Sequence, residues 1–166
     1  MSVKTVPFSD ELIQNIAAKY GTPFHIYDEK GMLDNVKRFQ KAFSWNPNFH
    51  EYFAVKATPN PTILKILKEE GCGTDCSSLT ELMMSDRCGF DGSEIMFSSN
   101  DTPAEEFILA KQLGATINLD DITHIEFLKE CAGIPEKISC RYNPGGVFAL
   151  GTDIMDNPGD AKYGMT

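Results

Sequence analysis

The chain has 166 residues, of which 42% are hydrophobic and 23% are charged. This composition is typical of a soluble globular domain and excludes a fibrous or disordered chain. The formal net charge of -9 argues against nucleic acid or an anionic membrane surface as a partner, because no cluster of lysine and arginine is present to neutralise a run of phosphates.

Neither a membrane span nor a signal peptide is expected. No apolar run approaches the roughly 18 residues that cross a bilayer, and residues 1–5 lack the apolar stretch of a signal peptide. The five cysteines are an odd number with irregular spacing and are predicted to be reduced thiols, and Cys72 and Cys76 lack the second pair of a typical zinc pattern. We therefore expect a cytoplasmic protein without a metal site.

The N-terminal part is predicted to hold two amphipathic helices around a short strand. Ser9 is expected to cap the first helix, and Gly21 and Pro23 to end it. Residues 24–27 are predicted to form the strand. The second helix has apolar residues at spacings of four, three and four: Met32, Val36, Phe39 and Phe43. A boundary near Asp28 would give a lead segment, 1–28, and a second segment, 29–166.

From residue 52 onward, short apolar strands alternate with helices. Strands are predicted at 52–55, 74–76, 95–97, 115–119 and 138–142. Four helices lie between them, and each has a recognisable start: Asn60 before Pro61, capping boxes at Ser78 with Glu81 and at Thr102 with Glu105, and Asp121. Residues 143–159 are predicted to form one long loop, and no closing element is expected after it.

Five such units imply right-handed crossovers that build a parallel sheet. The sheet could be an open, doubly wound one or part of a (β/α)8 barrel. Lys56 ends the first strand of the series, and the carboxyl ends of parallel strands line the site in both architectures. A desolvated lysine there could attack an aldehyde. The alternative is a lysine that simply extends its amine to solvent from the strand end.

The motifs around this lysine resemble those of the fold-type III pyridoxal-phosphate decarboxylases, the group that contains diaminopimelate, ornithine and arginine decarboxylases. The resemblance lies in residues 53–57 with Pro59-Asn60-Pro61, and it continues through 20–23, 26–28, 73–78 with Glu81, 96–100, 117–120, 141–144 and 162–164. In order and spacing it covers nearly the whole chain, from about Tyr20 to Thr166.

The resemblance implies an α/β fold of the (β/α)8 TIM-barrel type, as in the alanine racemase-like barrels, with about five units present. It implies pyridoxal 5'-phosphate as the cofactor, held as a Schiff base on Lys56, with a second β domain and a head-to-tail homodimer completing the sites. The implied reaction is decarboxylation of an amino acid. Diaminopimelate, which gives L-lysine, is preferred because residues 20–28 and 141–164 look closest to that branch; a carboxynorspermidine, ornithine or arginine type of polyamine metabolism is the alternative.

Further site residues follow from the resemblance, each with a structural alternative. Asp75 would lie near the cofactor lysine, or only cap local backbone. Arg141 would donate hydrogen bonds to the cofactor or to a carboxylate, or only form a salt bridge. Glu81 is explained by its capping role, and Lys162 would pair with an acidic group across a dimer interface or be solvated. The histidines, His25, His50 and His124, are given no role.

A complete barrel needs about 250 residues, so three interpretations remain open. The chain would be an inactive fragment of a decarboxylase, one part of an enzyme split between two chains that needs the missing C-terminal half, or a non-catalytic binding or regulatory module. Five strands alone are expected to leave two unpaired edges and the apolar interior of the barrel uncovered.

Overall fold

The computed structural model describes residues 5–145 and 163–165. They belong to two compact units, Met1–Phe43 and Ser44–Thr166. The division into a lead of residues 1–28 and a segment of residues 29–166 stays a prediction. In the part of the chain that is described, no helix has both the length and the apolar character that a bilayer span requires. All five cysteines are thiols and form no disulfides.

The first unit consists of two helices, α1 (Asp10–Tyr20) and α2 (Glu29–Ala42). The Ser9 hydroxyl accepts a hydrogen bond from the Leu12 amide at 3.2 Å, and Gly21 follows α1 with a φ of 79°, so both predicted ends of α1 are confirmed. The strand predicted at residues 24–27 is wrong. This segment has no strand neighbour among the described residues, and β structure requires a hydrogen-bonded partner.

The second unit is built on five parallel strands in the order β1-β2-β3-β4-β5. The strands are β1 (Tyr52–Ala54), β2 (Gly73–Cys76), β3 (Ile95–Ser98), β4 (Thr116–Leu119) and β5 (Ile138–Cys140). The helices between them are α3 (Pro61–Glu69), α4 (Leu79–Arg87), α5 (Ala104–Gln112) and α6 (Thr123–Cys131), with short 3-10 helices η1 (Val55–Ala57) and η2 (Gly92–Glu94). Strands that are neighbours in sequence are neighbours in the sheet, which is the order of a partial barrel and not of a doubly wound sheet.

At three of the four predicted helix starts, the predicted residue accepts a backbone hydrogen bond, so these starts are confirmed. Asn60 and Ser78 are N-caps whose side chains accept backbone hydrogen bonds, and Asp121 accepts one from the Thr123 amide. The capping box at Thr102 and Glu105 is wrong. Pro103 takes the cap position before α5 without a side-chain hydrogen bond.

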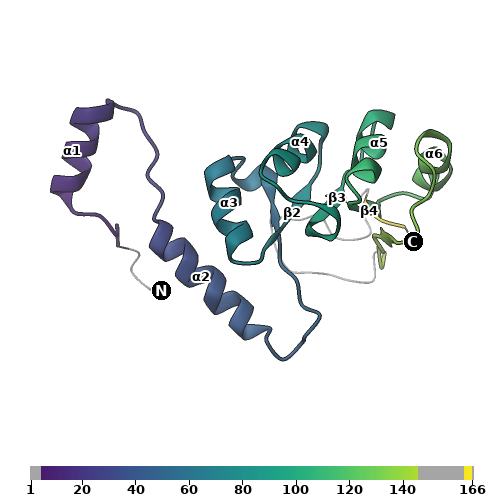
Figure 1. Ribbon diagram of the computed structural model, residues 1–166, viewed down its shortest axis with the longest axis horizontal. Helices are drawn as coiled ribbons and strands as arrows, with labels where there is room; N and C mark the ends of the chain where they lie inside the picture. Colours follow the sequence, from purple (N-terminus) through teal and green to yellow (C-terminus); the bar gives the residue numbers. More distant parts are fainter. Residues whose placement is uncertain (1–4, 146–162, 166) are drawn as a thin grey trace. The chain divides into compact units, whose positions relative to one another are not determined.

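The helices α3 to α6 cover one face of the sheet, and they follow one another in chain order in Figure 1. The strand side chains that point toward them are fully or almost fully buried: Thr74, Cys76, Ile95, Phe97, Ile117 and Leu119. Phe107 of α5 packs edge-on against Phe97 with ring centroids 6.1 Å apart. The hydrophobic core of this unit therefore lies between the sheet and its helices.

The opposite face of the sheet carries the alternate residues of the strands, and we call it the open face. Its side chains are mostly polar: Tyr52, Asp75, Met96, Ser98, Asn118, Ser139 and Arg141. The expectation that five strands uncover an apolar barrel interior is therefore wrong at these positions. The apolar side chains lie on the helix side, because successive residues of a strand point to opposite faces.

A sixth stretch of chain adds to the sheet beyond β5. Tyr142 and Met165 form a parallel bridge, in which the Met165 amide donates to the Arg141 carbonyl at 2.8 Å and the Asn143 amide donates to the Met165 carbonyl at 2.8 Å. Residues 163–165 thus lie where the next strand of the series would run, although no such element was expected there. The rest of the predicted loop, residues 146–159, lies outside the described residues.

Candidate active site

The open face contains a shallow pocket of about 310 Å³ across the middle of the sheet. Every strand contributes to it, either from within the strand or from the residue that follows it: Tyr52, Asp75, Met96, Ser98, Asn118, Ser139 and Arg141. In parallel α/β folds, ligands bind at the carboxyl ends of the strands. Six of the seven side chains are polar, so the pocket suits a polar ligand.

Lys56 lies at the carboxyl end of the sheet, in η1 directly after β1. The strand is one residue shorter than predicted, and η1 packs against β2. The Lys56 side chain is exposed, and its positive charge acts on Asp75 of β2. The predicted proximity of these two residues is therefore present, although Lys56 itself is not among the residues that line the pocket.

Asp75 is the partly buried carboxylate of the site. Desolvation by burial raises its pKa, and the like charge of Glu81 adds to this, whereas the charges of Lys56 and Arg141 oppose it. One carboxylate oxygen, Oδ1, is buried and accepts no hydrogen bond from the described residues. A buried oxygen without a donor is costly, so this atom is suited to accept a hydrogen bond from a bound group.

Arg141 directly follows β5, and its side chain contacts three other parts of the unit. Its Nη2 donates a hydrogen bond to Ser98 Oγ at 3.0 Å, and its Nε lies 2.9 Å from Asp120 Oδ1 in an ion pair that lacks hydrogen-bond alignment. The guanidinium lies 5.9 Å from the centre of the Tyr163 ring. Arg141 therefore forms the salt bridge of the structural interpretation and also lines the pocket. Its role toward a cofactor stays a prediction.

A row of hydrogen-bonded polar side chains runs beside Arg141 across β3, β4 and β5. Ser98, Asn118 and Ser139 occupy paired positions in the sheet. Ser139 Oγ donates to Asn118 Oδ1 at 2.9 Å, and Asn118 Nδ2 donates to Ser98 Oγ at 3.4 Å. This row fixes the side-chain orientations on the open face, because each member uses its polar atoms on a neighbour.

The sequence motifs predicted no role for these three residues or for Asp120. A signal for them exists, since polar residues recur at every second position of the strands on the face that also carries Asp75: Ser98; Asn118 and Asp120; Ser139 and Arg141.

The remaining predicted residues fall outside the pocket. The Glu81 carboxylate accepts a hydrogen bond from the Ser77 amide at 2.7 Å, which agrees with its structural role at the start of α4, one residue away from a strict capping box. His50 and His124 lie against Tyr52 and Phe107, respectively. Lys162 lies outside the described residues.

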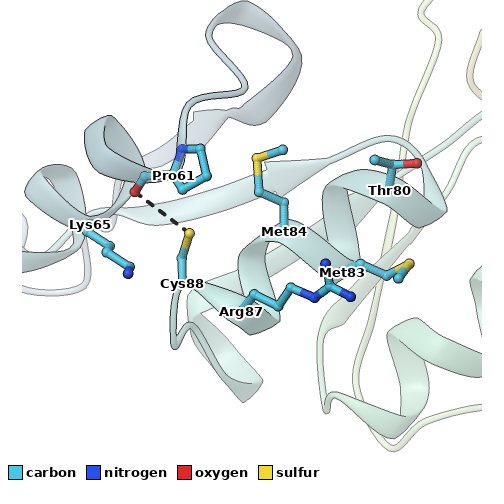
Figure 2. Close-up of a pocket in the computed structure, with 7 residues that line it drawn as sticks. All are labelled: Pro61, Lys65, Thr80, Met83, Met84, Arg87 and Cys88. Atoms are coloured by element: carbon cyan, nitrogen blue, oxygen red, sulfur yellow. Dashed lines mark hydrogen bonds between the residues drawn. The ribbon is translucent and has the colours of Figure 1, made fainter.

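A second pocket lies on the helix side of the unit, between α3 and α4. Figure 2 shows its lining: Pro61, Lys65, Thr80, Met83, Met84, Arg87 and Cys88. The only cysteine among these residues, Cys88, is 93% buried, and its thiol lies 3.8 Å from the Pro61 carbonyl oxygen. This pocket lies on the other side of the sheet from Asp75 and Arg141, so we assign the candidate active site to the open face.

Residues 30–166 match the family model described as pyridoxal-dependent decarboxylase, pyridoxal binding domain. The chain belongs to this family. The match covers both the sheet and the three predicted site residues, so the pyridoxal binding domain is the part of the family fold that contains Lys56, Asp75 and Arg141. The fold expected from the sequence motifs, a partial barrel of the decarboxylase type, is thereby confirmed.

Curated relatives extend the comparison. The chain is 39% identical over 154 residues to protein TabA of Pseudomonas amygdali pv. tabaci, and the alignment covers 93% of this chain and 36% of the relative. It is 33% identical over 155 residues to the diaminopimelate decarboxylase of Thermoplasma acidophilum, covering 92% of this chain and 37% of the relative. The chain thus spans little more than a third of the length of these relatives.

Solved structures share the same fold. A single-substitution variant of the diaminopimelate decarboxylase from Helicobacter pylori, complexed with L-lysine, has a TM-score of 0.74 at 27% identity and covers 80% of this chain and 34% of its own. The ornithine decarboxylase from Entamoeba histolytica has a TM-score of 0.64 at 31% identity and covers 74% of this chain and 39% of its own.

Proposed function

We propose that this domain binds pyridoxal phosphate through Lys56 and serves a decarboxylase that acts on an amino acid. The observation that carries the proposal is the position of Lys56 at the carboxyl end of five parallel strands, where its charge acts on Asp75. The buried Oδ1 of Asp75 accepts no hydrogen bond from the described residues. Membership of the family supports it.

The residues of the open face suit this cofactor. Lys56 offers an amine for covalent attachment to an aldehyde. Among the described residues, Asp75 Oδ1 accepts no hydrogen bond, and the Arg141 guanidinium offers donors to an anionic oxygen. Bound pyridoxal phosphate would supply an electron sink that accepts the electron pair released when an α-carboxylate leaves.

The charges of the site suggest a division of roles between the three residues. We infer that Asp75 orients Lys56 and balances its charge, and that its raised pKa allows it to hold a proton more readily than an exposed aspartate. Arg141 would orient an anionic group in the pocket, since Ser98 and Asp120 hold its side chain in place. These roles concern binding and orientation, which are the contributions that a protein makes to cofactor chemistry.

We propose meso-diaminopimelate as the substrate and L-lysine as the product. The support is the number of relatives named diaminopimelate decarboxylase, at 27–35% identity. Ornithine is the second candidate, because the ornithine decarboxylase from Entamoeba histolytica has 31% identity to this chain, more than the 27% of the Helicobacter pylori structure. A carboxynorspermidine or arginine type, or a domain that binds the cofactor without turnover, follows after these.

We also propose that turnover needs parts that the relatives have and this chain does not match. The relatives are almost three times as long as the matched region. A cytoplasmic homodimer, with the C-terminal half of the family supplied in the same or another chain, is the arrangement that we propose for the active enzyme.

Covalent trapping tests the proposed role of Lys56. The chain is incubated with pyridoxal phosphate, reduced with borohydride, digested and analysed by mass spectrometry. We expect the cofactor mass on the peptide that contains Lys56, and we expect Lys56→Ala to lose it. Lys65→Ala, which removes an exposed lysine on α3, is the matched control and should leave the label unchanged. Label that persists in Lys56→Ala would refute the assignment.

Release of carbon dioxide tests the substrate. Diaminopimelate and ornithine are each supplied to the chain with pyridoxal phosphate, alone and together with a polypeptide that contains the C-terminal half of a relative. We expect release from diaminopimelate only in the second case. Preferential release from ornithine would replace the proposed substrate, and the absence of release in all cases would favour a non-catalytic domain.

A further inference from the structure

We propose that Asp120 is a positioning residue that fixes the Arg141 guanidinium on the open face of the sheet and thereby sets the charge that a ligand in the pocket meets. The significance of this role for pyridoxal phosphate rests on the proposed function. The contact between the two residues does not depend on it.

Asp120 is a buried charge with one cationic partner among the described residues. Its side chain is 4% exposed, and Oδ1 lies 2.9 Å from Arg141 Nε. The residue directly follows β4, and its carbonyl oxygen accepts a hydrogen bond from the Gly164 amide at 3.0 Å. A buried carboxylate is tolerated when a cation compensates its charge. The ion pair therefore stabilises both the buried position of Asp120 and the observed position of the Arg141 side chain.

Arg141 is held on several sides, whereas its guanidinium is still accessible. The side chain is 42% exposed and lines the pocket. Two backbone hydrogen bonds fix its main chain. The Arg141 amide donates to the Leu119 carbonyl, and the Arg141 carbonyl accepts from the Met165 amide. Asp120 lies at Nε and Ser98 at Nη2, so the remaining donors of the guanidinium are available to the pocket.

Asp120 acts through Arg141 because it does not line the pocket itself. The charges that act on Asp75 include Lys56, Glu81 and Arg141, but not Asp120. Loss of Asp120 can therefore reach Asp75 by releasing Arg141. This makes the carboxyl of Asp75 a reporter of the position of Arg141 in the chain without any cofactor.

The titration of Asp75, followed by the 13C signal of its carboxyl carbon, tests the proposal. Asp120→Leu keeps the approximate shape of the side chain and removes its charge and acceptor oxygens, and Asp120→Asn is a milder variant that keeps one acceptor. We expect the Asp75 midpoint to move to higher pH in Asp120→Leu, as in Arg141→Gln, because the Arg141 charge, which together with that of Lys56 lowers the pKa of Asp75, is released. In the double variant the midpoint should match that of Arg141→Gln alone.

An Asp75 midpoint that does not move to higher pH in Asp120→Leu would overturn the proposal. If Arg141 stays in place without Asp120, its charge is less compensated and the Asp75 midpoint stays where it is or falls. A shift caused by Asp120→Leu that is as large in the Arg141→Gln background as in the wild type would also refute it. Should Asp120→Leu fail to fold, the same comparisons apply to Asp120→Asn.

A matched control and a second readout separate this proposal from the proposed function. Asp121→Asn removes a neighbouring, exposed carboxylate and should leave the Asp75 titration unchanged. Covalent trapping of pyridoxal phosphate on Lys56 is measured in the same variants, and we expect weaker labelling in Asp120→Leu. If the wild type takes no label while the titration behaves as expected, the proposed function fails and the role of Asp120 stands.

Discussion

Asp75 combines two properties that usually oppose each other in a folded protein, a charge and partial burial. Its Oδ1 has no donor among the described residues, and desolvation raises its pKa. Such a group lowers the stability of the unliganded, folded chain at neutral pH. Groups that lower stability in this way are common in binding sites.

Asp75→Asn should therefore stabilise the unliganded chain near neutral pH. The folded chain binds a proton at Asp75 more readily than the unfolded chain, so this group favours folding below the unfolded pKa, about 3.9 for aspartate. That contribution is lost as the pH rises through the raised, folded pKa. We expect a gain on the order of 1 kcal/mol at pH 7, or about 2–4 °C in Tm.

Thermal unfolding of both proteins at several pH values measures this effect. The difference between them should shrink as the pH falls below the ordinary range of aspartate, where both side chains are neutral. Asp121→Asn serves as the control, because the Asp121 carboxyl has a lowered pKa through its hydrogen bonds to Thr123 and should show the opposite pH dependence. Equal stability of Asp75→Asn and the wild type at pH 7 would contradict the argument.

For single residues, the sequence motifs predicted Lys56, Asp75 and Arg141 as site residues, but not the side chains that contact them. Lys56, Asp75 and Arg141 follow from motifs at strand ends. The ion pair of Asp120 with Arg141 joins the ends of two strands, and it depends on how β4 and β5 align. Spacing along one chain does not reveal that alignment, so Asp120 and Ser98 were not recognised.

Among the elements, the start of α4 shows how much a few side-chain hydrogen bonds contribute. Ser78 Oγ accepts from the Glu81 amide, the Glu81 carboxylate accepts from the Ser77 amide, and Glu106 of α5 accepts from the Leu79 amide at 2.9 Å. These contacts satisfy backbone donors that a helix start leaves unpaired. They also fix the chain that leaves β2 directly after Asp75 and Cys76.

Ser78→Ala should therefore lower the free energy of unfolding by about 1 kcal/mol, since it removes the N-cap acceptor. Chemical denaturation of the two proteins measures the change. Thr80→Ala removes a similar hydroxyl from an exposed position in the same helical turn and should cost much less. If the two substitutions have the same effect, the cap contributes nothing specific.

The errors of prediction at this scale have physical causes. The segment at residues 24–27 has strand-forming residues, but it pairs with no strand in the described part of the chain. At the start of α5, Pro103 occupies the cap position, and the buried Glu106 reaches across to α4 instead of back to its own helix. Both outcomes depend on tertiary neighbours, which local sequence patterns do not contain.

For the whole sheet unit, stability depends on the layer between the strands and the helices. Phe97, Phe107 and Leu64 are at most 1% exposed within it. This burial on the helix side explains how the open face can consist largely of polar side chains without loss of a core.

Phe97→Ala should lower the free energy of unfolding by about 3–5 kcal/mol, because it leaves a cavity between β3 and α5. This is a large part of the roughly 5–15 kcal/mol that stabilises a typical domain. Denaturation monitored by circular dichroism measures the loss. Ile122→Ala, at a position that is 64% exposed, should change stability little, and an equal loss there would contradict this assignment of the core.

The fold class could be predicted at this scale because five strands alternate with four helices. The polarity of the open face was not predicted, although the sequence contains a signal for it, because the signal appears only when alternate residues of several strands are compared. Asp75, Ser98, Asn118 and Ser139 then lie on one side, and Cys76, Phe97, Ile117 and Ile138 on the other.

The pairing of Asn118 with Ser139 has a consequence for evolution and engineering of this chain. Insertion or deletion of one residue in the turn before β5 would slide that strand by a single step and exchange its two sides. After an insertion, Ile138 and Cys140 would occupy the places of Ser139 and Arg141, and after a deletion, Cys140 and Tyr142 would do so. Length changes in this turn are therefore tolerable only in pairs of residues, or where the turn absorbs the extra residue without moving the strand.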